Sequence, residues 1–322
     1  MLDVTISTDA IRVGSHFAMS FQRTLRIPDD GRAYPLPPGL GRLPILRVAD
    51  YLDRVPHAWR DCGGGFIPMY QREALWLGFH AAAWKPNAAK IAVGKVNAIS
   101  GKPDDTTLHA DPQDYVVCPD QPWLDGIHTT HESIRQFVAM PLGLGYTVEA
   151  SMTSEENFGG IQVTVYEPLP GTFPDEPPIK ADTGLVRSSM PKTGGITSMG
   201  LGAGGEIKQK IYSDRYGIEV WDQHNYGQIV IHIINSLQFF EITGLEPPPT
   251  PINAKTYTEY GLPWFDLYDE TMGGVAPSER FVKVKTISDR DTELGNTVQA
   301  DVSFEVSEAQ IKKLNKTTHR CE

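Results

Sequence analysis

Apolar and polar residues alternate along much of the chain, which is the pattern of β-strands with one buried face. The alternation occurs in residues 146–152, 161–166, 207–211, 218–221, 281–287 and 302–306. Two other segments, 91–99 and 229–234, are more continuously apolar. We expect both to be central strands. A buried helix is the alternative for 229–234, because periodicity does not separate the two in a short apolar run.

Helical periodicity is rare in this sequence. Apolar residues recur at positions 48, 51, 52 and 55 ahead of Pro56, which predicts a short amphipathic helix that ends before the proline. Near the C-terminus, Ser307 followed by Gln310 has the spacing of a capping box. This spacing predicts a second short helix that continues through Leu314.

Proline and glycine divide the chain into segments. Residues 167–205 are rich in proline, then in glycine and serine, and have no sustained periodicity. We expect a long surface connection there, between a β-rich module of residues 1–166 and another of residues 206–322, with a single large domain as the alternative. Many short strands separated by turns favour a mainly β fold, an antiparallel β-sandwich or jelly-roll-like architecture with a few short helices. An α+β fold is the alternative.

Charge and composition narrow the classes of partner. The 322 residues include 40 acidic and 29 basic ones, a net charge of −11, and the basic residues form no dense cluster. Nucleic acids and anionic membrane surfaces are therefore not expected partners. The sequence has no apolar run of the length that a membrane span requires, and its first residues do not resemble a signal peptide. Three cysteines without a C-x-x-C pair fit a soluble protein of the reducing cytoplasm.

One group of residues has the composition of a metal site. His128, His131 and Glu132 lie close together in the sequence, with His109 and Asp111 upstream. Imidazole and carboxylate are the ligands of zinc and of non-haem iron, so these five residues are candidate ligands of a divalent transition metal. Their spacing departs from the zinc-protease motifs.

The same segment has an interpretation without a metal. Thr129 and Glu132 are spaced as a capping box, an apolar stripe follows them, and Pro141 closes the segment. The histidines would then flank the start of a surface helix.

The run of glycines at 200–205 matches the spacing of a dinucleotide-binding motif. That motif needs a strand before the glycines and a helix after them, so that the phosphates meet the helix N-terminus. Here a poor strand precedes the glycines and a strand-like pattern follows them. The context favours a loop over a nucleotide site.

Aromatic and acidic side chains alternate near residue 265, and Trp264, Asp266, Tyr268 and Asp269 are candidate ligand-binding residues. Aromatic rings beside paired carboxylates are typical of sites that bind or hydrolyse carbohydrate. A packed aromatic corner with solvated acids is the alternative.

No complete catalytic motif is present in the sequence. We therefore expect a β-rich binding or self-assembly protein, and a homo-oligomer in particular. Two alternatives remain open at this point. One is a metal-dependent enzyme of the hydrolase or oxygenase type at the histidine and carboxylate residues, and the other is a carbohydrate-binding or carbohydrate-active module.

Overall fold

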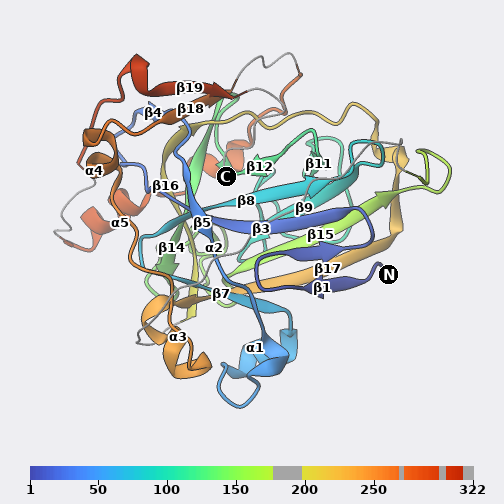
Figure 1. Ribbon diagram of the computed structural model, residues 1–322, viewed down its shortest axis with the longest axis horizontal. Coiled ribbons are helices and arrows are strands. Elements are labelled where there is room, and N and C mark those ends of the chain that lie inside the picture. The colour runs from blue at the N-terminus through green and yellow to red at the C-terminus, as the bar shows by residue number, and fades with distance from the viewer. Residues whose placement is uncertain (177–197, 268–271, 297–301, 315–322) are drawn as a thin grey trace.

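The computed structural model describes residues 1–176, 198–267, 272–296 and 302–314 (Figure 1). Within these residues the regular structure is dominated by antiparallel β-sheet, and the helices are short. The expected mainly β fold with a few short helices is therefore confirmed. Hydrogen-bonded pairings join seventeen of the described strands into one network. The sandwich or jelly-roll form of this network stays a prediction.

Seven long strands form the body of the network: β3 (Phe17–Thr24), β8 (Ala74–Ala81), β9 (Asn87–Val93), β14 (Ser133–Pro141), β15 (Ile161–Pro168), β16 (Ser198–Lys208) and β17 (Trp221–Asn235). Shorter strands extend it: β1 (Val4–Ile6), β2 (Ile11–Val13), β4 (Ala33–Tyr34), β5 (Gly39–Arg42), β6 (Leu46–Arg47), β7 (Gly65–Met69), β10 (Val96–Asn97), β11 (Val116–Cys118), β12 (Trp123–Leu124) and β13 (Gly126–His128). A separate parallel pair consists of β18 (Trp264–Leu267) and β19 (Ile311–Leu314).

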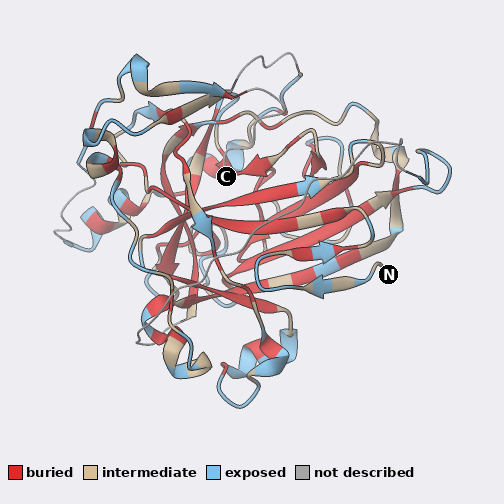
Figure 2. Cartoon of the chain, viewed as in Figure 1, coloured by how far each residue is buried: buried red, intermediate tan, exposed pale blue. Residues whose placement is uncertain are grey.

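One apolar core connects the long strands. Alternate residues of β3 and β15 belong to the same buried cluster: Phe17, Met19, Phe21, Ile161, Val163 and Val165. Successive side chains of a strand point to opposite faces, so this spacing gives each strand one continuous apolar face. Figure 2 shows that buried residues follow the strands, whereas exposed residues gather in the loops and at the periphery. The strands expected at 161–166 and within 229–234 are confirmed as β15 and part of β17.

Within the described residues there are five α-helices: α1 (His57–Cys62), α2 (Val148–Thr153), α3 (Ser236–Thr243), α4 (Ala254–Glu259) and α5 (Ile287–Glu293). Short 3-10 helices occur in the same part of the chain: η1 (Val48–Asp50), η2 (Ile218–Val220), η3 (Glu279–Lys283) and η4 (Glu308–Gln310). Helices α1 and α3 lie together at the lower end of Figure 1 and share a small apolar cluster that includes Trp59 and Phe239. Among the helices of the described residues, none is both long enough and apolar enough to cross a membrane.

Several elements differ from those that local patterns predict. In the segment 146–152, expected as a strand, residues 148–152 belong to α2, because the side chain of Thr147 accepts a hydrogen bond from the N–H of Ala150 and caps the helix. Residues 281–287 form part of η3 and the start of α5, and residues 302–306 form no strand. Short alternating runs are weak signals, and a local cap outweighs them.

The predicted helices were also placed wrongly. The helix expected at 48–55 is limited to the single turn η1. Ser307 and Gln310 do form a capping box, but it opens only η4, and Ile311 begins β19. The helix expected from Thr129 to Pro141 is instead a turn followed by β14, and in the turn the hydroxyl of Thr130 accepts a hydrogen bond from the N–H of Ser133 at 2.9 Å.

The surface connection expected at 167–205 was wrong at its C-terminal end, because residues 198–205 are the first part of β16. Residues 177–197 lie outside the described residues. Strand β16 pairs with β14, and β17 pairs with β15. Strands from residues 1–166 and from residues 206–322 therefore share one hydrogen-bonded network. The division into two modules stays a prediction.

Candidate functional sites

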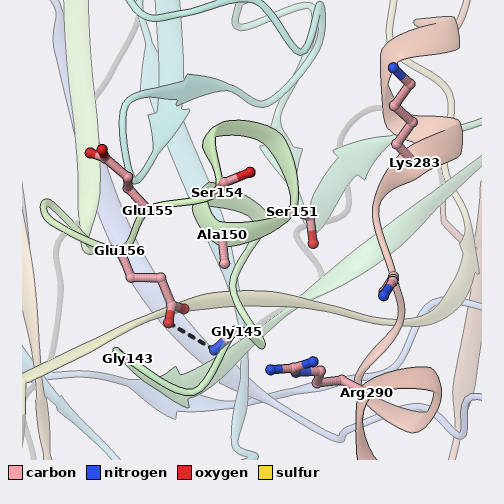
Figure 3. Close-up of a pocket in the computed structure, with 10 residues that line it drawn as sticks. Gly143, Gly145, Ala150, Ser151, Ser154, Glu155, Glu156, Lys283 and Arg290 are labelled. Carbon is pink, nitrogen blue, oxygen red and sulfur yellow. Dashed lines mark hydrogen bonds between the residues drawn. The ribbon is translucent and has the colours of Figure 1, made fainter. Parts of the chain in front are cut away.

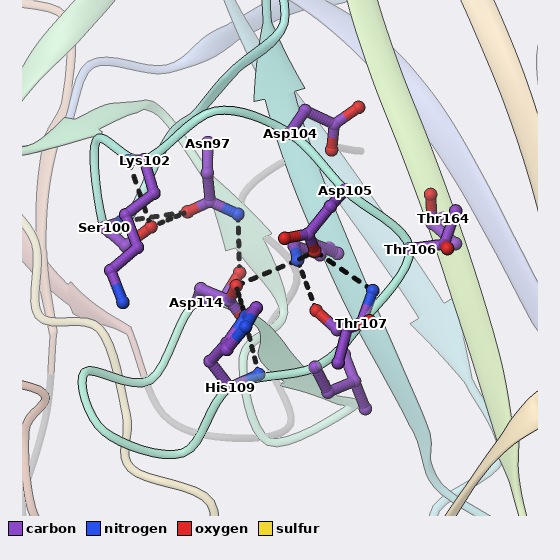
Figure 4. Close-up of polar contacts among 12 residues, drawn as sticks. Asn97, Ser100, Lys102, Asp104, Asp105, Thr106, Thr107, His109, Asp114 and Thr164 are labelled. Atoms are coloured by element: carbon purple, nitrogen blue, oxygen red, sulfur yellow. Dashed lines mark hydrogen bonds and ion pairs between the residues drawn. The ribbon is translucent and has the colours of Figure 1, made fainter.

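A buried lysine organises the first candidate site (Figure 4). Lys90 lies on β9, and its side chain is only 1% exposed. Its ammonium group contacts the carboxylates of Asp105 and Asp114, the latter at 2.9 Å, and the carbonyl oxygen of Thr107. An ammonium group has three N–H donors, so each donor has its own acceptor here. These contacts tie the loop that follows β10 to the middle of β9.

Asp114 also orients His109. One carboxylate oxygen of Asp114 accepts the backbone N–H of His109 at 2.9 Å, and the other lies 2.8 Å from Nδ1 of its ring. The carboxylate favours the proton on Nδ1 and leaves Nε2 as an acceptor. The Asp114 side chain is buried, whereas that of His109 is 35% exposed. Carboxylate and imidazole pairs of this kind orient metal ligands and general bases in other proteins.

The residues around Lys90 include three side chains of the types that bind metal ions. In the described part of the chain, Asp105, His109 and Asp114 are the one set of three candidate ligands whose ligand atoms all lie within 4.8 Å of one another. However, the ammonium of Lys90 already forms an ion pair with each of the two carboxylates. A divalent cation at the same oxygens would be repelled by that ammonium at short range. The group therefore fits a lysine-centred ion-pair network better than a metal centre.

Of the five metal ligands predicted from the sequence, only His109 belongs to this group. His128 is fully buried at the end of β13. His131 and Glu132 are exposed in the turn that leads to β14, and Asp111 is exposed in the loop before β11. Among the described residues, the five side chains are not brought together as one ligand set. Closeness along the sequence failed here because His128 is buried at the end of a strand, whereas His131 and Glu132 lie in the exposed turn that follows it.

The predicted carbohydrate site is not formed as expected. Trp264 is fully buried, and its Nε1 donates a hydrogen bond to the hydroxyl of Thr258 at 3.1 Å. A ring that stacks on a sugar must be accessible, so the predicted role of Trp264 was wrong. Asp266 is half-buried on β18. Tyr268 and Asp269 lie outside the described residues.

The second candidate site is a cleft of about 570 Å³ that the sequence did not indicate (Figure 3). It lies between α2 with its flanking loops and the segment that runs from η3 into α5. Its volume is within the range of sites for small ligands. The cleft is lined by Gly143, Gly145, Ala150, Ser151, Ser154, Glu155, Glu156, Lys283, Lys285 and Arg290.

Helix α2 and the loop after it are held firmly in place. Ser154 ends the helix in a left-handed conformation, with φ at 64°. The buried carboxylate of Glu149 then accepts the backbone N–H groups of Asn157, Phe158 and Gly159. Three charge-assisted hydrogen bonds to one side chain fix the path of the loop that carries two acidic residues of the cleft.

Helix α5 forms the opposite wall and is anchored to the body of the protein. Thr286 and Asp289 form a capping box at its start. Asp291 accepts hydrogen bonds from Arg72 and from the hydroxyl of Tyr146, both at 2.6 Å. Burial raises the pKa of Asp291, but these two hydrogen bonds outweigh it and hold the pKa below its ordinary value.

The cleft residues come from two segments, 143–156 and 283–290, that are far apart in the sequence. In each segment the local pattern suggested a strand, so sequence reasoning missed both walls. One signal was present, because Thr286 and Asp289 have the spacing of a helix cap. Comparisons of the chain with models of protein families, with curated proteins and with solved structures found no match.

Proposed function

We propose that this chain is a β-rich binding protein whose ligand is a small polar molecule held in the cleft between α2 and α5. The observation that carries the proposal is the cleft itself, which has the volume of a small-molecule site and is lined by hydroxyl, carboxylate and cationic side chains. Both of its walls are anchored by hydrogen bonds to buried groups, so the site is formed before a ligand arrives.

Binding is favoured over catalysis by the chemistry of the lining. Two serines, Ser151 and Ser154, are the hydroxyl nucleophiles of the cleft. A serine needs a neighbouring base to become reactive. Among the described residues, no hydrogen bond joins either serine hydroxyl to one of the lysines or glutamates that line the cleft. The metal-dependent enzyme is supported less well, because Lys90 supplies the cation in the described histidine and carboxylate cluster. Self-association stays a prediction.

The proposal is tested by filling the cleft. Ser151→Trp places a large side chain in it, and Thr5→Trp, at an exposed position of β1, is the matched control. We would measure melting temperatures with a panel of sugars, amino acids, organic acids and nucleotides. A ligand present at about 100 times its Kd adds about 2.7 kcal/mol, or roughly 5 °C for a domain of this size.

We expect at least one compound to stabilise the wild type and the Thr5→Trp variant but not the Ser151→Trp variant. If no compound stabilises the wild type, or if each active compound stabilises all three proteins equally, the cleft is not the binding site.

A further inference from the structure

The two walls of the cleft carry opposite charges (Figure 3). Glu155 and Glu156 lie in the loop after α2, on one side of the cleft. Lys283 and Arg290 lie in the segment from η3 to α5, on the other side. Lys285, from the same segment, also lines the cleft. A ligand with one sign of charge would be attracted by one wall and repelled by the other. Complementarity to both walls requires a ligand that carries both charges.

Backbone contacts hold two of these charges apart. Glu156 accepts the N–H of Gly145 at 2.8 Å and the hydroxyl of Thr147 at 2.6 Å. Arg290 donates from Nε to the carbonyl oxygen of Leu144 at 3.1 Å. The carboxylate and the guanidinium group are therefore both fixed to the same turn, at residues 144 and 145. Their positions are set by the backbone of that turn, before any ligand binds.

Gly145 is the residue that makes this arrangement feasible. Its φ of +74° lies in the left-handed region that favours glycine, and a Cβ at this position would lie 2.7 Å from Nη2 of Arg290. A side chain here would push the guanidinium group out of the cleft. Arg290 also pairs through Nη1 with Glu293 at 3.1 Å, which keeps the guanidinium group in place on the basic wall.

We propose, on the basis of the proposed function, that the ligand of this cleft is a zwitterion that carries an ammonium and a carboxylate group, either a free amino acid or a short peptide with free ends. The carboxylate of the ligand meets Arg290, and its ammonium group meets Glu156, the two charged side chains that face each other in Figure 3. Ser151 of α2 and Ser154, which ends that helix, also line the cleft, and their hydroxyls supply further hydrogen bonds.

The test uses a mixed library of amino acids, dipeptides and tripeptides in four forms: with free ends, with acetylated amines, with amidated carboxyls, and with both ends blocked. Native mass spectrometry of the full chain measures which compounds are retained. We expect compounds with free ends to bind about tenfold or more tighter than either singly blocked form, because each block removes one charged hydrogen bond.

Two variants distinguish the contribution of the acidic wall from that of the basic wall. Glu156→Gln keeps an acceptor for Gly145 and Thr147 but removes the charge, and it should abolish the preference for a free amine alone. Arg290→Gln should abolish the preference for a free carboxylate alone. Arg12→Gln, at an exposed position of β2, is the control and should leave both preferences unchanged.

The proposal of a zwitterionic ligand is overturned if free-ended compounds are not retained, or if blocking one end has no effect on binding. Loss of preference for both ends in either variant would also overturn it. The proposed function would still stand in these cases if another compound of the panel bound the wild type and failed to bind Ser151→Trp.

Discussion

At the scale of single residues, two buried histidines affect stability more clearly than function. His128 is fully buried on β13. His232 lies on β17, where its ring stacks on Trp59 with 4.5 Å between the ring centroids. Burial lowers the pKa of each to about 4 from an ordinary 6.5. For His128 the nearby His131 adds to this effect.

These pKa values predict loss of stability in mild acid. The unfolded chain takes up protons at these positions near pH 6.5, but the folded chain does so only near pH 4. The contribution is therefore complete above pH 6.5 and decreases as the pH falls towards 4, by about 3 kcal/mol for each histidine. Urea unfolding at pH 7.5 and pH 4.5 should show a smaller pH effect in a double variant, His128→Phe with His232→Phe. An unchanged pH effect would contradict the prediction.

Residue identity alone did not separate a metal ligand from a structural residue. Asp114 orients the ring of His109, and the ammonium group of Lys90 holds Asp114 in place. Lys90 lies on β9, well before the loop that carries the other two residues. The sequence did not indicate a role for Lys90 because lysine is normally exposed. Its burial depends on three hydrogen-bond acceptors that come together only in the folded protein.

At the scale of elements, the glycines of β16 explain how the cleft is built. Gly200 and Gly202 are two residues apart and therefore face the same side of the strand. A Cβ at Gly200 would lie 2.9 Å from the side chain of Thr147, and a Cβ at Gly202 would lie 2.8 Å from the carbonyl oxygen of Tyr146. Ile287 of α5 is also close to Gly202. The absence of side chains lets α2 and α5 pack directly on the strand.

The close packing of α2 and α5 against the glycines of β16 leads to a testable prediction. Gly202→Ala should destabilise the protein by about 1 to 3 kcal/mol, because a backbone carbonyl must move to accommodate the methyl group. Gly273→Ala is the control, since a Cβ there would meet only the flexible hydroxyl of Ser213. Its effect should stay within about 0.5 kcal/mol. Equal free energies of unfolding for the two variants, measured in urea, would show that the close approach is unimportant.

The glycine run was predicted as a loop because glycine is weak in isolated strands. What local reasoning did not include is that Gly204 and Gly205 fall where the pairing of β14 and β16 is irregular, between Arg135 and Phe137. Extra residues at a β-bulge are often glycines. The strand forms because β14, β17 and β4 pair with it through backbone hydrogen bonds, and because α2 and α5 pack on it.

At the scale of the whole molecule, strands that precede residue 177 pair with strands that follow residue 197. This pairing predicts how the protein unfolds. β15 exchanges hydrogen bonds with β17 along most of its length, and β14 does so with β16. Separating the halves would leave an edge of β14 and an edge of β15 without their partner strands. We therefore expect one cooperative transition, with far-ultraviolet circular dichroism and tryptophan fluorescence changing together on heating. Two well-separated calorimetric transitions would support the two-module prediction instead.

The sequence by itself determined the β-rich character of this protein and the strand at 161–166, because alternating apolar and polar residues give a strand one buried face. For 229–234 the sequence left a strand and a buried helix open, and the structure shows the strand. Only the tertiary structure decided that Trp264 is buried and that Glu156 faces Arg290 across a cleft. Each of these depends on contacts between segments distant in the chain. The energy of such contacts is comparable to local preferences, and a sequence read locally does not contain them.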